Sequence, residues 1–382
     1  MAGRGNIDTQ NGLGSTEALV VSQKGGQFEL KEVQLKEMRS NEVVVRMVAT
    51  GICHTDLATV HGFKGPGLPA ILGHEGSGVV EQVGSDVKHV EVGDHVLLTY
   101  NACLDCTSCR RGNYSYCKHA QQLSFGGSRL DGTRTFSCNG EDISSPYFGQ
   151  SSFAKRSIVG GFCAVKVDKS LPLEILCCIG CGIQTGAGTV LNVLKPQLGS
   201  SIAVFGVGGV GLAAIMAAKN FTPATKIIAI DVQDSRLEMA KELGATHVLN
   251  SKGRDIVELI HSVTDGDGVD YALDATGNVA VVQAMIDSTA NSGIAATVGG
   301  VPAGQHVKIE PGSWLARNVS YIGSCQGSSV PQKFIPALAE FWRQGRFPID
   351  RLTKSYSYKE VNQAIDDMHH GQTIKPVLIW AD

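Results

Sequence analysis

Four closely spaced cysteines form the densest set of metal-ligating side chains in the chain. Cys103, Cys106, Cys109 and Cys117 follow a C-x2-C-x2-C-x7-C pattern within a polar, glycine-containing stretch. Four thiolates at such spacing can surround a tetrahedral Zn²⁺ ion at about 2.3 Å. Because a closed set of four thiolates leaves no open position for a substrate, the predicted metal is structural. An iron–sulfur cluster is the alternative use of four cysteines, but nothing else in the sequence indicates electron transfer.

A glycine-rich run farther along the chain can bind phosphate. Gly206, Gly208 and Gly211 have G-x-G-x-x-G spacing, after a strand-like segment and before an apolar helical one. In that context the first glycine permits a tight turn, the second lets the backbone approach a pyrophosphate, and the third allows close helix–strand packing. The start of the helix, with Gly209 and Val210, offers free N–H groups to the phosphates.

An acidic residue at the end of the next expected strand indicates which dinucleotide binds. Asp231 lies twenty residues after Gly211. Its carboxylate can accept hydrogen bonds from both ribose hydroxyls of NAD and would repel the 2′-phosphate of NADP. Val232 follows, where a neutralising arginine would be needed for NADP, and Arg236 can flank the adenosine ribose. The sequence therefore predicts NAD.

A second set of possible metal ligands is dispersed. Cys53 lies in a GICHTD segment, His74 and Glu75 lie in GHEG, and Cys181 lies in GCGIQTG. Spacing alone cannot bring these residues together, and a single cysteine is often only a small buried apolar side chain.

Composition limits the class of protein and its compartment. The chain has 382 residues, a hydrophobic fraction of 43% and a net charge of −3, which is typical of a globular protein and gives no strong basic excess for binding nucleic acid or a membrane surface. Residues Met1–Ser15 lack the apolar core of a secretory signal. The longest apolar stretch, Ile202–Ala218, is interrupted by four glycines and is no membrane span. We therefore expect a cytoplasmic protein, in which thiols stay reduced, so that the presence of eleven cysteines indicates metal binding or catalysis before disulfides.

The elements that must position these residues change in character near residue 183. Before it, the pattern predicts short strands separated by turns, and after it, strands alternate with helices, which is typical of a parallel sheet. We expect a β-rich domain over 1–182 with a cysteine lobe at 100–118, a dinucleotide-binding domain over 183–324, and a return to the first domain over 325–382. The clearest expected elements are strands at 42–48, 76–83, 95–99, 201–205, 226–231 and 375–380, and helices at 208–221, 235–243, 331–344 and 358–370.

With these motifs in this order, the chain resembles the zinc-containing medium-chain alcohol dehydrogenases from about Thr16 onward. The resemblance rests on the Cys53, His74 and Cys181 segments, the cysteine lobe, Asp131-Gly132-Thr133-Arg134 and the glycine run. It implies an α/β fold, with a GroES-like catalytic domain and a doubly wound Rossmann domain. It also implies hydride transfer between NAD and a primary alcohol or aldehyde.

The family resemblance implies a catalytic zinc ion held by Cys53, His74 and Cys181, so that each chain carries two zinc ions. Such a site keeps an open position, and zinc there lowers the pKa of the alcohol hydroxyl. Glu75 is expected behind the metal as a transient ligand. Asp56 is expected to orient the ring of His74.

The same resemblance assigns the proton path and further cofactor contacts. It places the Thr55 hydroxyl against the substrate oxygen and Thr185 beside the nicotinamide. Many family members end the proton relay in a histidine where this chain has Ala58. Either His54 or water can replace that histidine in the relay, and His54 can instead contact the pyrophosphate. We favour the phosphate role, because neighbouring side chains in an extended segment point apart. Lys375 is the expected second phosphate contact.

The substrate is less constrained. The Cys53 and Cys181 segments look most like those of aryl and benzyl alcohol dehydrogenases, which favours an aromatic or allylic alcohol. Glutathione-dependent formaldehyde dehydrogenase is an alternative, but Gln121 and Lys64 stand where that branch has an arginine and an acid. Leu57, Thr99 and Tyr100 are candidates for the pocket wall.

Two other classes stay open. An NADPH-linked aldehyde reductase is disfavoured by Asp231, and a non-catalytic relative is disfavoured because every expected ligand is present. The segment 121–152 resembles that of the mostly dimeric branch, which predicts a homodimer, with a tetramer as the alternative. Neither the natural alcohol nor the physiological direction follows from the sequence.

Overall fold

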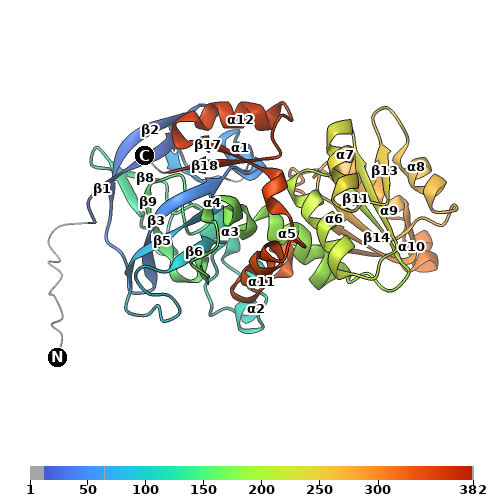
Figure 1. Cartoon of the computed structure of the whole chain (residues 1–382), viewed down its shortest axis with the longest axis horizontal. Coiled ribbons are helices and arrows are strands. Elements are labelled where there is room, and N and C mark those ends of the chain that lie inside the picture. Colours follow the sequence, from blue (N-terminus) through green and yellow to red (C-terminus); the bar gives the residue numbers. More distant parts are fainter. Residues whose placement is uncertain (1–12, 64, 381–382) are drawn as a thin grey trace. The chain divides into compact units, whose positions relative to one another are not determined.

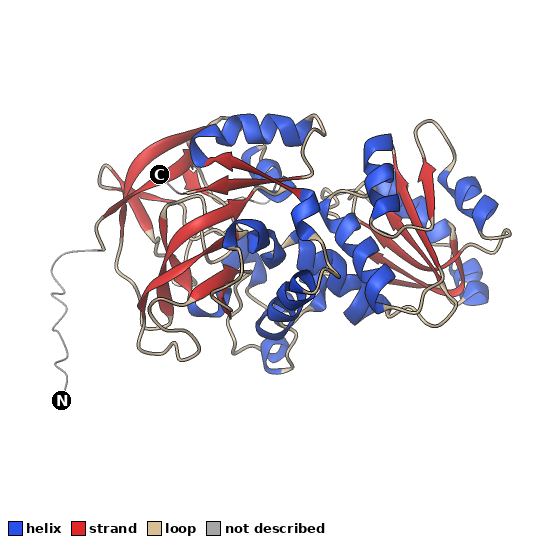
Figure 2. Ribbon diagram, viewed as in Figure 1, coloured by secondary structure: helices blue, strands red, loops and turns tan. Residues whose placement is uncertain are grey.

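The computed structural model describes residues 13–63 and 65–380, which belong to two compact units (Figures 1 and 2). Unit 1 comprises the described residues of Met1–Cys103, Lys118–Cys178 and Thr353–Asp382. Unit 2 comprises Leu104–Cys117 and Ile179–Leu352. In the sequence, the segments of unit 2 therefore lie between segments of unit 1.

Unit 1 is built on two sheets. A five-stranded sheet has the order β4-β1-β2-β7-β8, and a seven-stranded sheet has the order β10-β6-β5-β3-β18-β17, with β9 also paired to β3. The strands are β1 (Ser15–Val21), β2 (Phe28–Leu35), β3 (Glu42–Gly51), β4 (Ala70–Ile71), β5 (Gly76–Val83), β6 (His95–Leu98), β7 (Phe136–Cys138), β8 (Glu141–Ile143), β9 (Arg156–Gly160), β10 (Ala164–Val167), β17 (Thr353–Ser357) and β18 (Lys375–Ile379).

The C-terminal segment completes the seven-stranded sheet. Strand β18 pairs antiparallel with β3, with Leu378 opposite Thr50, and β17 pairs parallel with β18. Figure 1 shows the red C-terminal strands beside the blue strand β3. The C-terminal strands therefore belong to unit 1. The helices of unit 1 are α1 (His54–Val60), α3 (Ala120–Phe125), α4 (Leu173–Leu176) and α12 (Val361–His369).

Unit 2 contains a parallel six-stranded sheet in the order β13-β12-β11-β14-β15-β16. Strand β11 pairs with both β12 and β14, so the chain order reverses at β11 and the sheet is doubly wound. Helices cover both faces (Figure 2). The elements are α2 (Thr107–Arg110), α5 (Gly182–Gly188), η4 (Thr189–Leu194), β11 (Ser201–Phe205), α6 (Gly209–Phe221), β12 (Lys226–Asp231), α7 (Asp234–Glu242), β13 (His247–Asn250), α8 (Ile256–Val263), β14 (Val269–Asp274), α9 (Val279–Asp287), β15 (Thr289–Thr297), α10 (Pro311–Arg317), β16 (Ser320–Gly323), η5 (Gln326–Ser328) and α11 (Pro331–Arg343).

Apolar strand residues make the core of unit 2. Because helices cover both faces of this sheet, its strands are continuous apolar runs rather than alternating ones. The resulting cluster includes Ala203, Phe205, Ile228, Ile230, Ala272 and Ala295. Helix α6 packs against β11 because Gly211 has no side chain: a Cβ there would lie 2.0 Å from the Gly206 carbonyl oxygen.

The return to unit 1 comes at Thr353, later than the expected residue 325, and residues 104–117 group with unit 2. The reason is packing. In α11, Phe341 stacks on Phe221 with ring centroids 4.2 Å apart. After α11, Arg346 donates to the Asn220 carbonyl.

Within the described residues, no single helix is both long and apolar enough to cross a membrane. Only the bent pair Leu173–Gly180 and Gly182–Leu194 reaches that length and composition.

Candidate functional site

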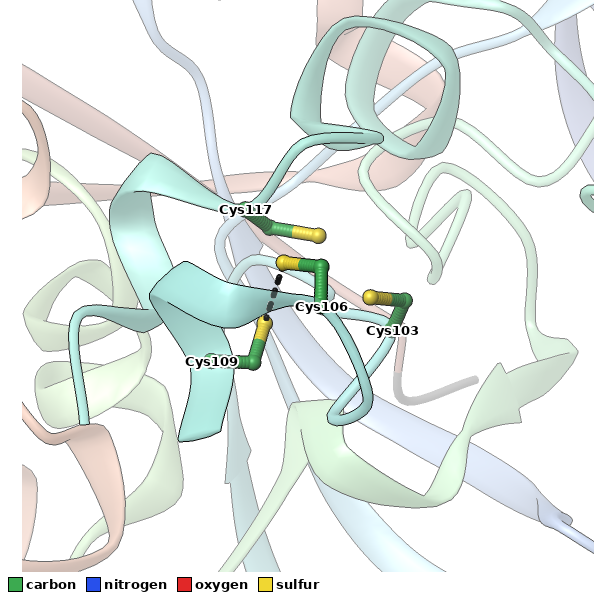
Figure 3. Close-up of side chains that lie close together, drawn as sticks. All are labelled: Cys103, Cys106, Cys109 and Cys117. Atoms are coloured by element: carbon green, nitrogen blue, oxygen red, sulfur yellow. Dashed lines mark hydrogen bonds between the residues drawn. The ribbon is translucent and has the colours of Figure 1, made fainter. Parts of the chain in front are cut away.

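The four lobe cysteines converge on one point. Their sulfur atoms all lie within 4.8 Å of one another, and those of Cys106 and Cys109 are 3.5 Å apart (Figure 3). Cys106 caps the start of α2 and Cys109 lies three residues later, so one helical turn brings both side chains to the same face. Burial and then the neighbouring thiols raise the pKa of Cys109 to about 12. A divalent cation would reverse that repulsion, which fits a closed zinc site.

A tyrosine fixes the lobe to the rest of unit 2. The Tyr116 hydroxyl lies 2.8 Å from the Ser328 hydroxyl and 3.4 Å from the Gly323 carbonyl. The backbone N–H of Cys325 donates to the same hydroxyl at 3.3 Å. The lobe is thereby attached to the segment that follows β16.

The dispersed ligands also come together. The ligand atoms of Cys53, His74, Glu75 and Cys181 lie within 4.8 Å of one another. Cys53 is the N-cap residue of α1, and Cys181 is the N-cap residue of α5. In the sequence, Cys181 comes three residues after Cys178, the last residue of a unit 1 segment. The positive end of each helix favours a thiolate at that position. His74 and Glu75 immediately precede β5.

His74 is held in one orientation by Asp56. The imidazole Nδ1 lies 2.9 Å from the Asp56 carboxylate, which also accepts the N–H groups of Gly73 at 3.2 Å and Cys53 at 3.0 Å. Burial lowers the pKa of His74, but Asp56 and Cys53 together raise it well above its ordinary value. The Nε2 atom is buried and has no hydrogen-bond partner among the described residues.

That buried nitrogen is the observation that tests for a metal. A buried polar atom without a partner is costly unless a ligand satisfies it. Here Nε2 lies beside two thiols and a carboxylate oxygen. Two cysteines and one histidine are the ligand set of a catalytic zinc site in alcohol dehydrogenase. The residues present therefore fit zinc.

Lys375, the expected second phosphate contact, has a partner within the chain that the sequence did not indicate. It is buried, and its Nζ lies 2.8 Å from both carboxylate oxygens of Glu75 and 3.2 Å from the Ile52 carbonyl. Burial raises the pKa of Glu75, and the Lys375 cation opposes that shift. The carboxylate also fits tightly against Gly51, where a Cβ would lie 2.2 Å from Glu75 Oε2.

Aromatic side chains that the sequence did not reveal surround His74. Phe148 stacks on the imidazole at 4.5 Å between centroids, and Tyr147 meets it edge-on at 5.7 Å. Phe125 packs against Phe148 at 5.0 Å. Only the fold brings 125 and 147–148 to His74, so no spacing signal could have identified them.

A buried glutamine, also unforeseen, fixes the backbone of the histidine segment. Gln150 Nε2 donates to the carbonyls of His74 at 2.9 Å and Thr99 at 3.0 Å, and its Oε1 accepts the Gly76 N–H at 3.1 Å. Thr99, a candidate for the pocket wall, is fully buried in this network. Tyr100 is also buried and packs edge-on against Phe162.

The glycine run has the geometry expected of a phosphate-binding turn. Gly206 has φ +84°, and Gly208 caps α6 with open space where a Cβ would be. Asp231 ends β12, and its carboxylate accepts the backbone N–H of Val207 at 2.9 Å. It also accepts the N–H groups of the next two residues, so three of about four acceptor positions are occupied. Arg236 lies 4.0 Å from it. The residues fit a dinucleotide, with one acceptor position of Asp231 left for a ribose hydroxyl.

The remaining predicted residues lie on α1 and α5. His54 is exposed and is the first residue of α1, so the expectation of an extended segment there is wrong. In a helix, successive side chains are about 100° apart rather than opposite. Thr55 Oγ1 lies 3.6 Å from Cys53 Sγ. The Thr185 hydroxyl donates to the Cys181 carbonyl at 2.8 Å.

The residues used to weigh substrates are less informative. Leu57 and Ala58 are half-buried on α1, and Gln121 is exposed on α3. Lys64 lies outside the described residues. Cys177 and Cys178 are fully buried and belong to the core.

Comparisons with known proteins agree with this geometry. Residues 39–143 match the alcohol dehydrogenase GroES-like domain, and residues 209–343 match the zinc-binding dehydrogenase domain. The chain is 39% identical to geraniol dehydrogenase of Castellaniella defragrans, covering 98% of this chain and all of that protein. It is 35% identical to S-(hydroxymethyl)glutathione dehydrogenase of Synechocystis, covering 95% and 99%. The crystal structure of benzyl alcohol dehydrogenase from Acinetobacter calcoaceticus superposes with a TM-score of 0.92 at 41% identity, covering 97% and 100%.

Proposed function

Because the chain belongs to the zinc-containing medium-chain alcohol dehydrogenases, we propose that it oxidises primary alcohols to aldehydes and catalyses the reverse reaction, with NAD as hydride carrier. The observation that carries this proposal is the convergence of Cys53, His74 and Cys181 around a buried imidazole nitrogen that lacks a partner. Such a site supports chemistry, because three protein ligands leave a tetrahedral metal one open position.

Each residue of the site has a separate task. Cys53, His74 and Cys181 would hold the zinc, which supplies a Lewis acid that favours loss of the hydroxyl proton. Asp56 keeps His74 Nδ1 protonated, so that the lone pair of Nε2 is free to bind the metal. Thr55 offers a hydroxyl beside Cys53 for passing on the substrate proton. His54, exposed at the start of α1, can receive that proton or contact a phosphate, and Ala58 can do neither.

NAD is the proposed cofactor because of Asp231. The Gly206–Gly211 turn and the start of α6 offer backbone N–H groups to the pyrophosphate. The nearby Asp231 carboxylate disfavours a 2′-phosphate. We expect Asp231→Gly to lower kcat/KM with NAD and raise it with NADP, on the order of tenfold each. A wild-type enzyme that already prefers NADP would contradict this assignment.

An aromatic or allylic primary alcohol is the proposed substrate class. Support comes from the rings of Phe148 and Tyr147 beside His74, and from Phe125, which packs against Phe148. The likeness to a geraniol dehydrogenase and a benzyl alcohol dehydrogenase supports the same class. The S-(hydroxymethyl)glutathione dehydrogenase relative keeps the formaldehyde adduct as the alternative. Gln121 offers no cation for the carboxylates of that adduct.

A substrate panel tests the proposal. Initial rates of NADH formation would be measured with benzyl alcohol, geraniol, hexanol, ethanol and S-(hydroxymethyl)glutathione, before and after zinc removal by a chelator. We expect the highest kcat/KM with the first two and no turnover without zinc. A preference for the glutathione adduct would establish the alternative, and zinc-independent turnover would refute the proposed mechanism.

We also propose a homodimer that acts in the cytoplasm on small molecules, without nucleic acid or membrane. Strand β16 is the last strand of its sheet and is paired to β15 among the described residues. Two apolar side chains in this part of unit 2 are exposed: Leu315 on α10 is 85% exposed, and Ile322 on β16 is also exposed. Such an edge is a site for pairing with a second copy. Sedimentation equilibrium of the wild type and of Ile322→Lys tests this, with a tetramer as the alternative outcome.

A further inference from the structure

The segment after β16 has an unusual backbone. Gln326, Gly327 and Ser328 have φ values of +51°, +64° and +48°, so three successive residues are left-handed. Only the middle one is glycine. The left-handed region is unfavourable for residues with a Cβ, and such strain persists only where surrounding contacts hold it.

Tight packing on α5 and η4 holds this segment. A Cβ on Gly188 would lie 2.6 Å from the Gly327 carbonyl oxygen, and a Cβ on Gly327 would lie 2.4 Å from the Gln184 carbonyl oxygen. Asn192 donates to the Gly327 carbonyl at 2.9 Å, and Tyr116 bonds to Ser328 at 2.8 Å. The backbone of 326–328 is therefore fixed from several sides.

Two side-chain amides then determine what faces Cys181. Gln184 Nε2 donates to the Gly180 carbonyl, which can only accept, and Gln184 Oε1 accepts from the Ser329 hydroxyl at 2.9 Å. The same Nε2 lies 3.2 Å from the Gln326 side chain, so the atom it meets must be the acceptor Oε1. The Gln326 Nε2 consequently faces Cys181 Sγ, at 3.8 Å.

We propose that Gln326 is a positioning residue for the catalytic metal site, because its amide N–H donates a hydrogen bond to the thiolate of Cys181. This inference rests on the proposed function, in which Cys181 is a zinc ligand. It assigns a role to a side chain that touches neither the metal nor the reacting atoms.

The physical effect follows from charge. A hydrogen bond to a ligand sulfur withdraws electron density, so the thiolate donates less to the metal and the metal stays a stronger Lewis acid. The bond also fixes the direction of the sulfur lone pairs. Because the backbone at Gln326 is held in a strained conformation, the donor keeps its position without help from the metal.

Cobalt substitution gives a direct test. Wild type and Gln326→Met would be loaded with Co²⁺, and the Cys53→Ala spectrum would be subtracted to remove the contribution of the four-cysteine cluster. Losing the N–H raises the energy of the sulfur lone pair, so we expect the thiolate-to-cobalt charge-transfer band of Gln326→Met to move to longer wavelength.

Three further variants distinguish the effect of the Gln326 amide from the effect of displacing the 326–328 segment. Gln344→Met makes the same change at the C-cap of α11, where the amide bonds to Glu340, and should leave the band unmoved. Ser328→Ala removes the Tyr116 contact but keeps the amide, and it should also leave the band unmoved. Gln326→Glu keeps the acceptor for Gln184 but replaces the donor, so it should shift the band even where the Met variant does not fold.

The outcomes are distinct. A Cys53-dependent band that stays unmoved in both Gln326 variants would overturn the role of the amide while leaving the proposed function standing. An equal shift in Ser328→Ala would overturn it too, since loop displacement would then be the cause. The absence of any Cys53-dependent metal band in wild type would overturn the proposed function and this inference together.

Discussion

The four-cysteine cluster draws its ligands from fifteen consecutive residues, whereas Cys53, His74 and Cys181 come from three separate segments. The first set would place four negative thiolates around a dication. The second would place two thiolates and a neutral imidazole around it. A zinc ion together with the four lobe thiolates would have a net charge of −2 and no open position. A zinc ion together with the second set would have no net charge and could accept an oxygen ligand.

The surroundings of the two ligand sets differ as well: buried charged groups lie beside the second set. The lobe cysteines lie on a turn, a four-residue helix and a loop fixed by Tyr116. Behind His74 lie the fully buried Asp56 carboxylate and the buried Glu75–Lys375 pair. Burying such polar groups costs stability unless each is paired. We infer that one cluster stabilises the fold and that the other gives up stability for reactivity.

Removing one ligand from each cluster is the strongest test of that contrast. Cys53→Ala should abolish turnover, by roughly a thousandfold or more, because metal-ion catalysis supplies several kcal/mol of transition-state stabilisation. The variant should stay folded and retain one zinc per chain, measured by atomic absorption. A fully active wild type that holds only one zinc would refute the contrast at once.

The matching change in the lobe should act on stability. Cys106→Ala opens the four-thiolate site, and structural zinc contributes its binding free energy to folding. We expect a fall of several kcal/mol, on the order of 3–5 kcal/mol, in the free energy of unfolding measured by urea denaturation. Cys138→Ala, at a half-buried cysteine of β7 outside both clusters, is the control and should change it little. Unchanged stability in Cys106→Ala would contradict a structural role.

The buried Glu75–Lys375 ion pair tests how much stability the polar groups of the catalytic site cost. Lys375→Met leaves the Glu75 carboxylate buried without its cation, so we expect a loss of about 3–5 kcal/mol in unfolding free energy near pH 8. Burial raises the folded-state pKa of Glu75, and removal of Lys375 raises it further. A carboxyl with a raised folded pKa binds more protons when folded, so the variant should lose stability as pH rises above about 4.3 and be less affected near pH 5.

A second lysine pair provides the control for that experiment. Lys354 lies 3.0 Å from Asp367, but its side chain is 54% exposed. Lys354→Met should therefore cost less than about 1 kcal/mol. Equal losses in the two lysine variants would show that burial of the Glu75–Lys375 pair carries no special penalty.

How much of this was predictable depends on whether the signal is local. Strands 201–205 and 226–231 were predicted with the bounds that the structure has, because a strand and its turn are encoded in neighbouring residues. The cysteine lobe is local in the same sense. By contrast, Phe148 beside His74 and Gln326 beside Cys181 depend on tertiary packing, and no spacing indicates them. The contact between Lys375 and Glu75 was not foreseen for the same reason.

The smallest expected effect concerns Asp56, which touches His74 but no metal. Its Oδ1 accepts from His74 and Gly73, and its Oδ2 accepts from Cys53. In Asp56→Asn one of these N–H groups must face an NH₂ group, whichever way the amide turns. We expect kcat/KM and zinc affinity to fall by about 10- to 100-fold. Asp255→Asn makes the same change at the cap of α8 and should leave both unchanged. An equal loss in the two variants would mean that Asp56 only caps α1, whereas a loss confined to Asp56→Asn would show that the orientation of His74 sets the strength of the catalytic site.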